Sequence, residues 1–136
     1  MTVRLNPYIA FAGGNARAAM EFYHSIFGGT LDVSTFGEFG APDPALADKV
    51  MHAQLKTDDD LIVMGADSPP GMEHVPGNNI AISLSGGEEE RLRGYWSQLA
   101  EGGTVSTPLE KQMWGDEFGT LKDRFGIEWM VNITQR

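Results

Sequence analysis

The sequence contains no cysteine among its 136 residues. Disulfides, thiolate nucleophiles and thiolate-bound metals are therefore excluded. Basic residues are also scarce, with 10 Lys and Arg against 19 Asp and Glu and a formal net charge of -9. Because the few basic side chains are scattered among acids, no local patch would attract a phosphate backbone or an anionic lipid surface. We expect neither nucleic acid nor a membrane as a partner.

Long hydrophobic runs are missing as well. The longest apolar stretch, LIVMGA at residues 61–66, has the size of a strand and is far shorter than the roughly 20 residues of a membrane span. The N-terminal segment MTVRLNPYIAFAGG has an apolar part too short for a secretion signal and no small-residue cleavage site. We therefore expect a soluble, cytoplasmic protein. With 41% hydrophobic residues, the 136-residue chain can bury one sizeable core, so a single domain is expected.

Hydrophobic patterning predicts two successive segments of the same organisation. The elements expected in the first segment are a strand within residues 5–14, a helix at 16–27 and three strands at 30–39, 49–57 and 61–66. A connector rich in Pro and Gly follows at residues 68–77. The elements expected in the second segment are a strand at 78–85, a helix at 88–103 and three strands at 104–112, 118–123 and 126–133. Both segments have the order βαβββ.

The ends of the two expected helices support a duplication. An aromatic pair is followed by Gly28-Gly29-Thr30 in the first segment and, with one more residue between, by Gly102-Gly103-Thr104 in the second. Self-similarity at this scale indicates two copies of one supersecondary unit. The predicted fold class is α+β, with a first module at residues 1–67 and a second at 78–136, each presenting a sheet that needs its partner to complete a cavity or core.

Three stretches resemble one protein family: FAGGNARAAMEFYHSIFGG, HAQLKTDDDLIVMGAD and MWGDEFGTLKDRFGIEWMVNI. They resemble the PhnB-like branch of the vicinal oxygen chelate superfamily, which includes glyoxalase I, extradiol dioxygenases and bleomycin-resistance proteins. The resemblance covers nearly the whole chain. It implies paired βαβββ modules, each a curved mixed sheet enclosing a concave cavity, assembled as a homodimer. Some members of the branch carry a demethylubiquinone methyltransferase label, and nothing in this sequence looks like a site for S-adenosylmethionine.

The resemblance also implies where a metal would bind. Enzymes of the superfamily use side chains from the first and last strand of each module, and these four positions fall at Tyr8, Met64, Asn79 and Met130. Tyr8 and Asn79 precede similar tripeptides, IAF and IAI, so the repeat gives the same equivalence. Phenol and amide oxygens bind divalent metals weakly, and thioethers favour soft Cu(I). We expect no cofactor at these positions, and a divalent metal elsewhere stays open.

Glu128 is the carboxylate closest to that set. Side chains two apart on a strand share a face, so Glu128, Met130 and Asn132 are predicted to point one way, opposite to Trp129 and Val131. A solvated carboxylate at the start of a strand is the favoured interpretation, because Glu is seldom buried without a partner. A relocated metal site that uses His52 with Glu128 is the alternative.

His52 and Gln54 alternate with apolar residues in VMHAQL. On the concave face they would offer an imidazole and an amide to a polar ligand. On a face turned to solvent or to a second subunit they would have no such role. His24, near a helix end, fits a capping role, and His74 lies in the connector; no local metal motif joins the three His.

Trp114 and Phe118 surround a Gly and two acids in MWGDEFG. Aromatic side chains on a loop beside a concave sheet are common walls of ligand sites. Trp114 is a candidate for such a wall, and Phe118 is expected in the core.

These observations lead to one hypothesis and two alternatives. The protein is expected to bind a small organic molecule in a cavity without the usual metal, by sequestration or with metal-free chemistry at His52, so catalysis is left open. The candidate ligand-binding residues are Tyr8, His52, Gln54, Met64, Asn79, Trp114 and Met130. One alternative is a metal-dependent lyase, isomerase or dioxygenase at the relocated site; the other is a dimeric accessory protein with a vestigial cavity.

Overall fold

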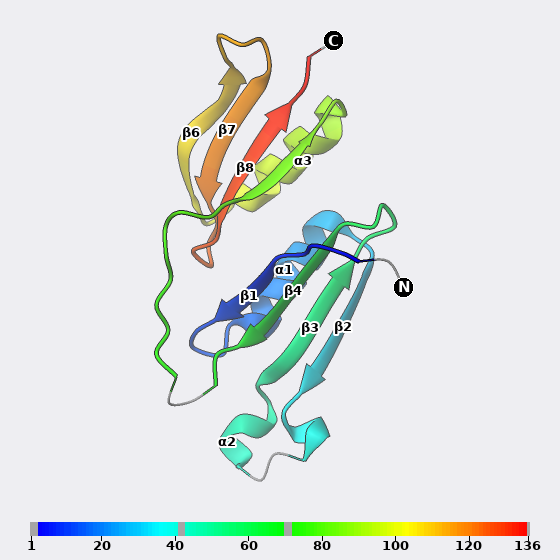
Figure 1. Ribbon diagram of the computed structural model, residues 1–136, viewed down its shortest axis with the longest axis vertical. Helices are drawn as coiled ribbons and strands as arrows, with labels where there is room; N and C mark the ends of the chain where they lie inside the picture. The colour runs from blue at the N-terminus through cyan, green and yellow to red at the C-terminus, as the bar shows by residue number, and fades with distance from the viewer. Residues whose placement is uncertain (1–2, 41–42, 70–71, 136) are drawn as a thin grey trace. The chain divides into compact units, whose positions relative to one another are not determined.

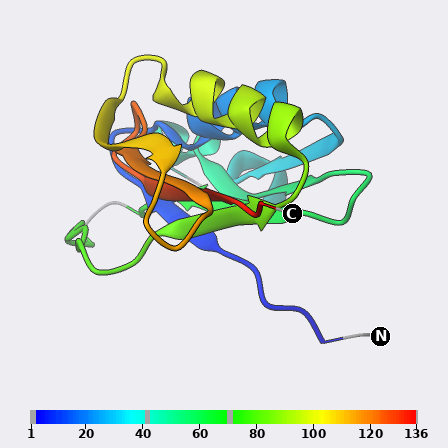
Figure 2. The same ribbon diagram turned by 90° about the horizontal axis from the view of Figure 1, so that it is seen from above.

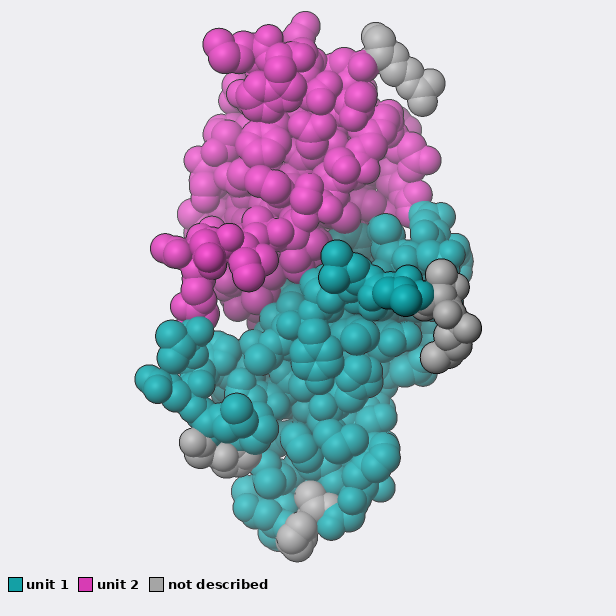
Figure 3. All heavy atoms as spheres, in the orientation of Figure 1, with its two compact units in different colours: residues 1–75 teal, residues 76–136 magenta. Residues whose placement is uncertain are grey.

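A computed structural model describes residues 3–40, 43–69 and 72–135. The chain divides into two compact units, residues 1–75 and 76–136 (Figure 3). The division lies inside the connector expected at residues 68–77, of which residues 70 and 71 fall outside the described part. Each unit has its own sheet and its own long helix.

The first unit has the predicted order with additional turns. Its elements are β1 (Tyr8–Phe11), α1 (Ala16–Phe27), β2 (Thr30–Thr35), η1 (Gly37–Phe39), α2 (Pro44–Ala47), β3 (Val50–Lys56) and β4 (Ile62–Asp67). The strands form one mixed sheet in the order β1-β4-β3-β2 (Figure 1). β1 runs parallel to β4, whereas β4 with β3 and β3 with β2 are antiparallel.

The second unit repeats this topology. Its elements are β5 (Ile82–Gly86), α3 (Glu89–Ala100), β6 (Thr104–Lys111), β7 (Glu117–Lys122) and β8 (Glu128–Ile133). The sheet order is β5-β8-β7-β6, again with one parallel pair, β5 with β8, and two antiparallel pairs. The predicted α+β class and the duplicated βαβββ organisation are confirmed, and both sheets are open rather than closed.

Glycine after each long helix has the same packing role in both units. A Cβ on Gly29 would lie 2.6 Å from the Cα of Thr57, and a Cβ on Gly103 would lie 3.0 Å from the Cα of Asp123. In both cases it would also meet the carbonyl oxygen of the residue before. The chain that leaves each helix passes so close to the end of the central hairpin that only a residue without a side chain fits there.

One face of α1 forms the core of the first unit. The buried side chains of the helix recur at three- and four-residue spacing, which is one stripe of an α-helix: Ala16, Ala19, Met20, Tyr23 and Ile26. They pack against the side of the sheet that carries Phe11, Ala53 and Leu55. Figures 1 and 2 show α1 along one side only of the sheet of its unit.

Asp67 fixes the start of this helix. Its buried carboxylate accepts hydrogen bonds from the backbone N–H of Ala16 at 3.0 Å and of Val50 at 2.8 Å. The helix N-cap, Asn15, makes no side-chain capping bond. Asp67 therefore supplies an acceptor for an N–H that the first helical turn leaves unpaired, and joins the end of β4 to α1 and β3.

Helix α3 covers one side of the second sheet in the same way. The buried side chains of the helix are Leu92, Tyr95 and Leu99. They face the side of the sheet that carries the buried Leu121 and Trp129. Glu89 and Glu90 occupy its first turn, where negative charge interacts favourably with the helix dipole.

The turn between β7 and β8 depends on Asp123. This buried carboxylate accepts hydrogen bonds from the N–H groups of Phe125 at 2.8 Å and Ile127 at 3.1 Å, and from the indole Nε1 of Trp129 at 2.9 Å. One side chain therefore closes the turn and orients the largest buried residue of the unit. In the matching turn of the first unit Thr57 stands at this place, with its hydroxyl bonded to the N–H of Leu61 at 3.0 Å.

The extents of several predicted strands are wrong, and one short helix is missing from the prediction. The strand expected at 30–39 ends at Thr35, because a 3₁₀ turn at Gly37–Phe39 packs its first glycine against Ala47 of α2. The four-residue helix α2 was not predicted. The first strand covers only Tyr8–Phe11 of the expected 5–14.

Asp123→Ala should lower the free energy of unfolding by about 2–4 kcal/mol, because three donors, including the buried indole N–H of Trp129, lose their acceptor. Urea denaturation measures this. Asp58→Ala is the matched control, since Asp58 is an exposed carboxylate in the corresponding turn of the first unit. It should change stability by no more than about 0.5 kcal/mol. Equal midpoints for the two variants would contradict the anchoring role of Asp123.

Gly103→Ala should destabilise the protein by about 2 kcal/mol, because the new methyl group overlaps the backbone at Asp123 and the chain must shift. Gly94→Ala is the control with the same chemical change. Gly94 lies inside α3 with no atom within 4 Å of an added Cβ, so alanine should stabilise the helix by about 0.5–1 kcal/mol. Thermal unfolding of both variants checks the opposite signs; a stabilised Gly103→Ala would refute the close approach.

Candidate functional site

Four side chains line up across the sheet of the first unit. The strand register pairs Tyr8 with Met64, Met64 with Gln54, and Gln54 with Asp32. We call these four residues the cross-strand row. Since neighbouring strands lie about 4.8 Å apart, the row extends roughly 14 Å from β1 to β2.

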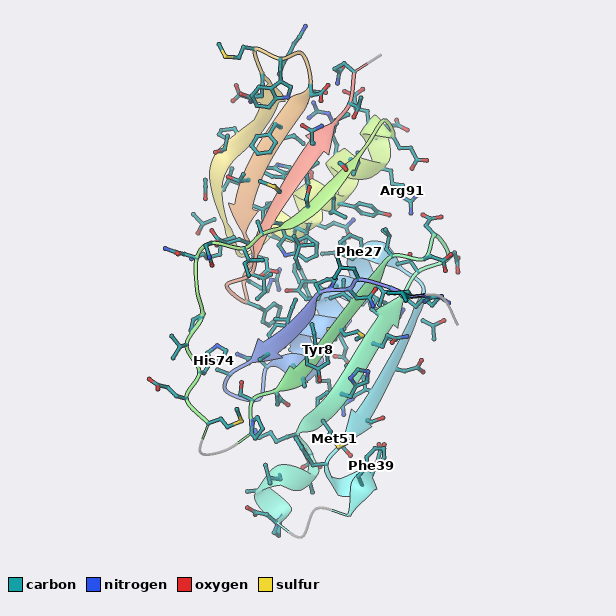
Figure 4. The ribbon with its side chains drawn as sticks, in the orientation of Figure 1. Tyr8, Phe27, Phe39, Met51, His74 and Arg91 are labelled. Carbon is teal, nitrogen blue, oxygen red and sulfur yellow. The ribbon has the colours of Figure 1, made fainter. Side chains whose placement is uncertain are left out.

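The row lies on the side of the sheet that α1 leaves uncovered. Ala53 and Leu55 flank Gln54 along β3 and are buried toward the helix, so Gln54 points the other way. Met64 likewise precedes Gly65, which lies against Phe11 and the helix residue Met20. Figure 4 shows Tyr8 over the open side of the sheet. The register places four residues on one face of the sheet, as predicted: Tyr8, His52, Gln54 and Met64.

The phenol ring of Tyr8 stacks on the imidazole of His52. Their ring centroids are 5.7 Å apart with an interplanar angle of 30°. His52 is paired with Ser34 in the neighbouring row, two residues along β3 from Gln54. A flat aromatic surface therefore lies at one end of the cross-strand row.

Three polar side chains on this face have no internal partner in the described part of the chain. Within residues 3–40, 43–69 and 72–135, the side chains of Asp32, His52 and Gln54 make no hydrogen bond or ion pair with another described residue. In contrast, no buried polar side-chain atom in that part of the chain lacks a partner. The open face therefore presents a carboxylate, an imidazole and an amide that are available to a ligand.

The second unit has an equivalent row of different chemistry. Ser83 pairs with Met130, Met130 with Thr120, and Thr120 with Thr107. Trp129 and Val131, on either side of Met130, are buried toward α3, so the predicted alternation along β8 is confirmed. This row carries hydroxyl groups where the first carries a phenol, an amide and a carboxylate.

The equivalence of Tyr8 with Asn79 is wrong. Tyr8 pairs with Met64 and Ser83 pairs with Met130, so Ser83 takes the place in the second unit that Tyr8 has in the first. Asn79 is exposed and precedes β5, which begins at Ile82. The letters IAF and IAI are similar, but the second tripeptide lies mostly outside the strand because β8 offers partners only from Glu128 onward.

Sequence reasoning also missed Asp32, Ser83 and Thr120. The alternation of Leu31, Asp32 and Val33 was a usable signal, since a polar residue between two apolar residues on a strand belongs to the opposite face. For Ser83 and Thr120 only the observed register identifies the row.

Glu128 is the first residue of β8 and is half-buried. Its cross-strand neighbour is Lys122, and it lies on the same side of the strand as Met130 and Asn132. Asn132 donates a hydrogen bond to Asp116 at 3.1 Å. His52 belongs to the first unit and Glu128 to the second, so the two residues of the alternative metal site come from different units.

Trp114 lies in the loop between β6 and β7 and is 59% exposed. Its ring meets Phe118 edge to face, with centroids 5.9 Å apart. Phe118 is half-buried and shares the open side of its sheet with Asn132, its cross-strand partner, so the expected core position of Phe118 is wrong. The next residue of β7, Gly119, instead faces the helix-covered core and lies against the ring of Trp96.

The other histidines have local contacts. The Nε2 of His24 lies 3.0 Å from the carbonyl oxygen of Gly29, where the ring can donate to a backbone group just past the helix, which agrees with the expected capping role. His74 is exposed in the connector (Figure 4), with its Nδ1 3.3 Å from the hydroxyl of Ser68.

The donors at the expected metal positions do not fit a hard divalent ion. Tyr8 and Met64 are adjacent in the first unit and offer a phenol and a thioether, while Met130 offers a thioether in the second. Mg²⁺, Mn²⁺ and Zn²⁺ favour carboxylate and imidazole ligands over these groups. Within the described ranges no three His, Asp or Glu side chains are grouped so that they could hold a metal.

The sequence relationship decides the family. Residues 4–132 match the family described as 3-demethylubiquinone-9 3-methyltransferase. The chain belongs to this family. It is a PhnB-like protein with the glyoxalase fold, as the resemblance predicted. Among curated relatives, YjdN of Escherichia coli is 26% identical over 148 residues, covering 97% of this chain and 96% of that protein. Mb0911c of Mycobacterium bovis is 29% identical over 134 residues, covering 93% and 80%.

Solved structures support the same conclusion for this PhnB-like protein. PA1353 from Pseudomonas aeruginosa is 36% identical, with a TM-score of 0.85 and coverages of 99% of this chain and 100% of that chain. A PhnB protein from Bacillus cereus matches in fold at 22% identity, with a TM-score of 0.77 and coverages of 97% and 100%. A glyoxalase/bleomycin resistance/dioxygenase domain from Frankia has the same fold at 15% identity, with a TM-score of 0.66 and 99% coverage of both chains.

None of the helices in the described part of the chain has the length and apolarity that crossing a bilayer requires.

The contact between Tyr8 and His52 can be measured by a double-mutant cycle. Tyr8→Ala, His52→Ala and the double variant should give a coupling free energy of about 0.5–1 kcal/mol, because stacked aromatic rings stabilise one another beyond the area they bury. The control cycle pairs Tyr8→Ala with Ser34→Ala, which lies on β2 at the far edge of the sheet, and should couple by less than about 0.3 kcal/mol. Urea unfolding gives all the values. Equal coupling in the two cycles would contradict the stack.

Proposed function

We propose that this PhnB-like protein binds a small organic molecule on the open side of the first sheet, without a metal ion. Tyr8, His52, Gln54 and Met64 supply the contacts. The observation that carries the proposal is the set of unpaired polar groups around a stacked aromatic pair, on a sheet face that the helix of its unit does not cover. We rest the proposal on this face rather than on the methyl transfer in the family's description, because function belongs to sites rather than to folds.

The residues have complementary roles in such a site. Stacked rings and a thioether provide apolar contact area, and the thioether of Met64 adapts to the shape of a ligand. Gln54 offers both a donor and an acceptor, and His52 offers one of each in its neutral form. A few convergent polar groups on an otherwise apolar surface are typical of small-molecule sites.

The second unit contributes further candidates. Met130 lies on the open face of its sheet, and Trp114 offers an exposed aromatic ring on a loop beside that face. Asn79, exposed ahead of β5, has less to support it as a ligand contact. Assembly as a homodimer and a cytoplasmic location stay predictions.

Ligand binding and metal content together test the proposal. Protein purified without chelators should contain substoichiometric metal by mass spectrometry, because the donors do not suit a hard ion. A metabolite panel in a thermal-shift assay should yield ligands whose Kd rises at least about tenfold in His52→Ala or Tyr8→Ala, a loss of about 1.4 kcal/mol. Glu21→Ala is the control, since Glu21 is exposed on α1, which covers the other side of the sheet, and should bind normally.

Two results would contradict this function. Tight stoichiometric metal that is lost in His52→Ala or Glu128→Ala would replace it with the metal-dependent alternative. A panel in which no compound raises the melting temperature would favour an accessory protein without a ligand.

A further inference from the structure

We propose that the open face of the first sheet selects an elongated organic cation, with an ammonium-type group at one end and a flat ring at the other. This inference rests on the proposed function and names the class of ligand. It follows from the order of side chains along the cross-strand row, from the exposure of its ends and from the charge of the unit around it.

The carboxylate of Asp32 lies at one end of the row, on the edge strand β2. It is exposed and makes no ion pair with another described residue. Lys56 is on the same side of the sheet, two residues beyond Gln54, but its ammonium lies 3.7 Å from Asp60, outside the row. Among the described side chains of the row, Asp32 is therefore a negative charge without a counterion, and a cationic ligand supplies one.

The other end of the row is aromatic. Tyr8 is 53% exposed, so its ring remains accessible while it stacks on His52. Met64, its neighbour in the row, adds a polarizable thioether, which makes favourable contacts with aromatic rings. A flat ring extends the existing stack at this end, and Gln54 lies between the two ends with an amide for hydrogen bonding.

Charge in the rest of the unit acts in the same direction. Residues 1–75 contain ten Asp and Glu side chains and four Lys and Arg side chains. A surface with this balance attracts cations and repels anions, and the effect weakens as salt is added. An anionic ligand on the row would face both the unit's net charge and the carboxylate of Asp32.

Matched indole probes test the selection. Tryptamine and indole-3-propionate share the ring and a two-carbon chain but carry opposite charges, and tryptophol is their neutral counterpart. In ¹⁵N–¹H NMR titrations at low salt, tryptamine should shift the amides of Asp32, His52 and Gln54. It should bind about tenfold more tightly than indole-3-propionate, with tryptophol between them.

Asp32→Asn should reduce the preference for tryptamine to less than about threefold, since the local charge pair is gone. Asp58→Asn removes the same charge from an exposed turn of the same unit, off the row, and should keep the preference. The amide spectra of both variants show whether each remains folded.

Each other result overturns the inference. Tighter binding of indole-3-propionate, or equal binding of all three probes at these residues, would remove the cation preference and leave small-molecule binding intact. A preference that survives Asp32→Asn as fully as Asp58→Asn would assign it to the overall charge of the unit instead of the row. If no probe shifts the row at any soluble concentration, the ligand class is wrong, and the metabolite panel then decides separately whether the face binds anything.

Discussion

Each four-stranded sheet is covered by its long helix on one side only. Because side chains alternate along a strand, one set of residues forms the core beneath the helix and the other set forms the open face. In the first unit, Ala53 and Leu55 are buried toward α1, and Gln54 between them faces outward. Register then aligns outward residues from different strands, as Tyr8 and Met64 show. A shift of one residue would exchange the two sets, so the core and the candidate site are fixed by the same hydrogen-bond ladder.

Two buried carboxylates stabilise the strand ends, and neither lies on the open face of a sheet. Asp67 joins β4 to the start of α1 and to β3, and Asp123 closes the last turn of the second unit around Trp129. The two copies share a topology but not these contacts, since Thr57 stands where Asp123 would be expected. Buried carboxylates at strand ends therefore stabilise both units. On the open face of the first sheet, the side chains of Asp32, His52 and Gln54 have no hydrogen-bond or ion-pair partner among the described residues that a ligand would have to displace.

Sequence periodicity was sufficient for the duplicated order of the fold and for the shared face of the candidate residues on β3. Alternation in VMHAQL and the helical spacing of α1 are local signals, and each agrees with the tertiary structure. Asn79 shows where local signals end. Its tripeptide resembles the one after Tyr8, but a residue joins a sheet only where a neighbouring strand offers backbone partners, and those begin later in the second unit. Asp32 was overlooked because its importance comes from strands that are distant in sequence.

The donor groups of the cross-strand row differ from those that a hard divalent ion prefers. A hard divalent ion needs several charged or imidazole ligands that converge, whereas the row places one carboxylate, one amide, one thioether and one phenol in a line. A linear arrangement favours a ligand that is itself extended, because each group then meets a different part of the molecule. Its ends differ in character, with the exposed carboxylate of Asp32 at one end and the accessible ring of Tyr8 at the other, so the proposed ligand would have one preferred direction.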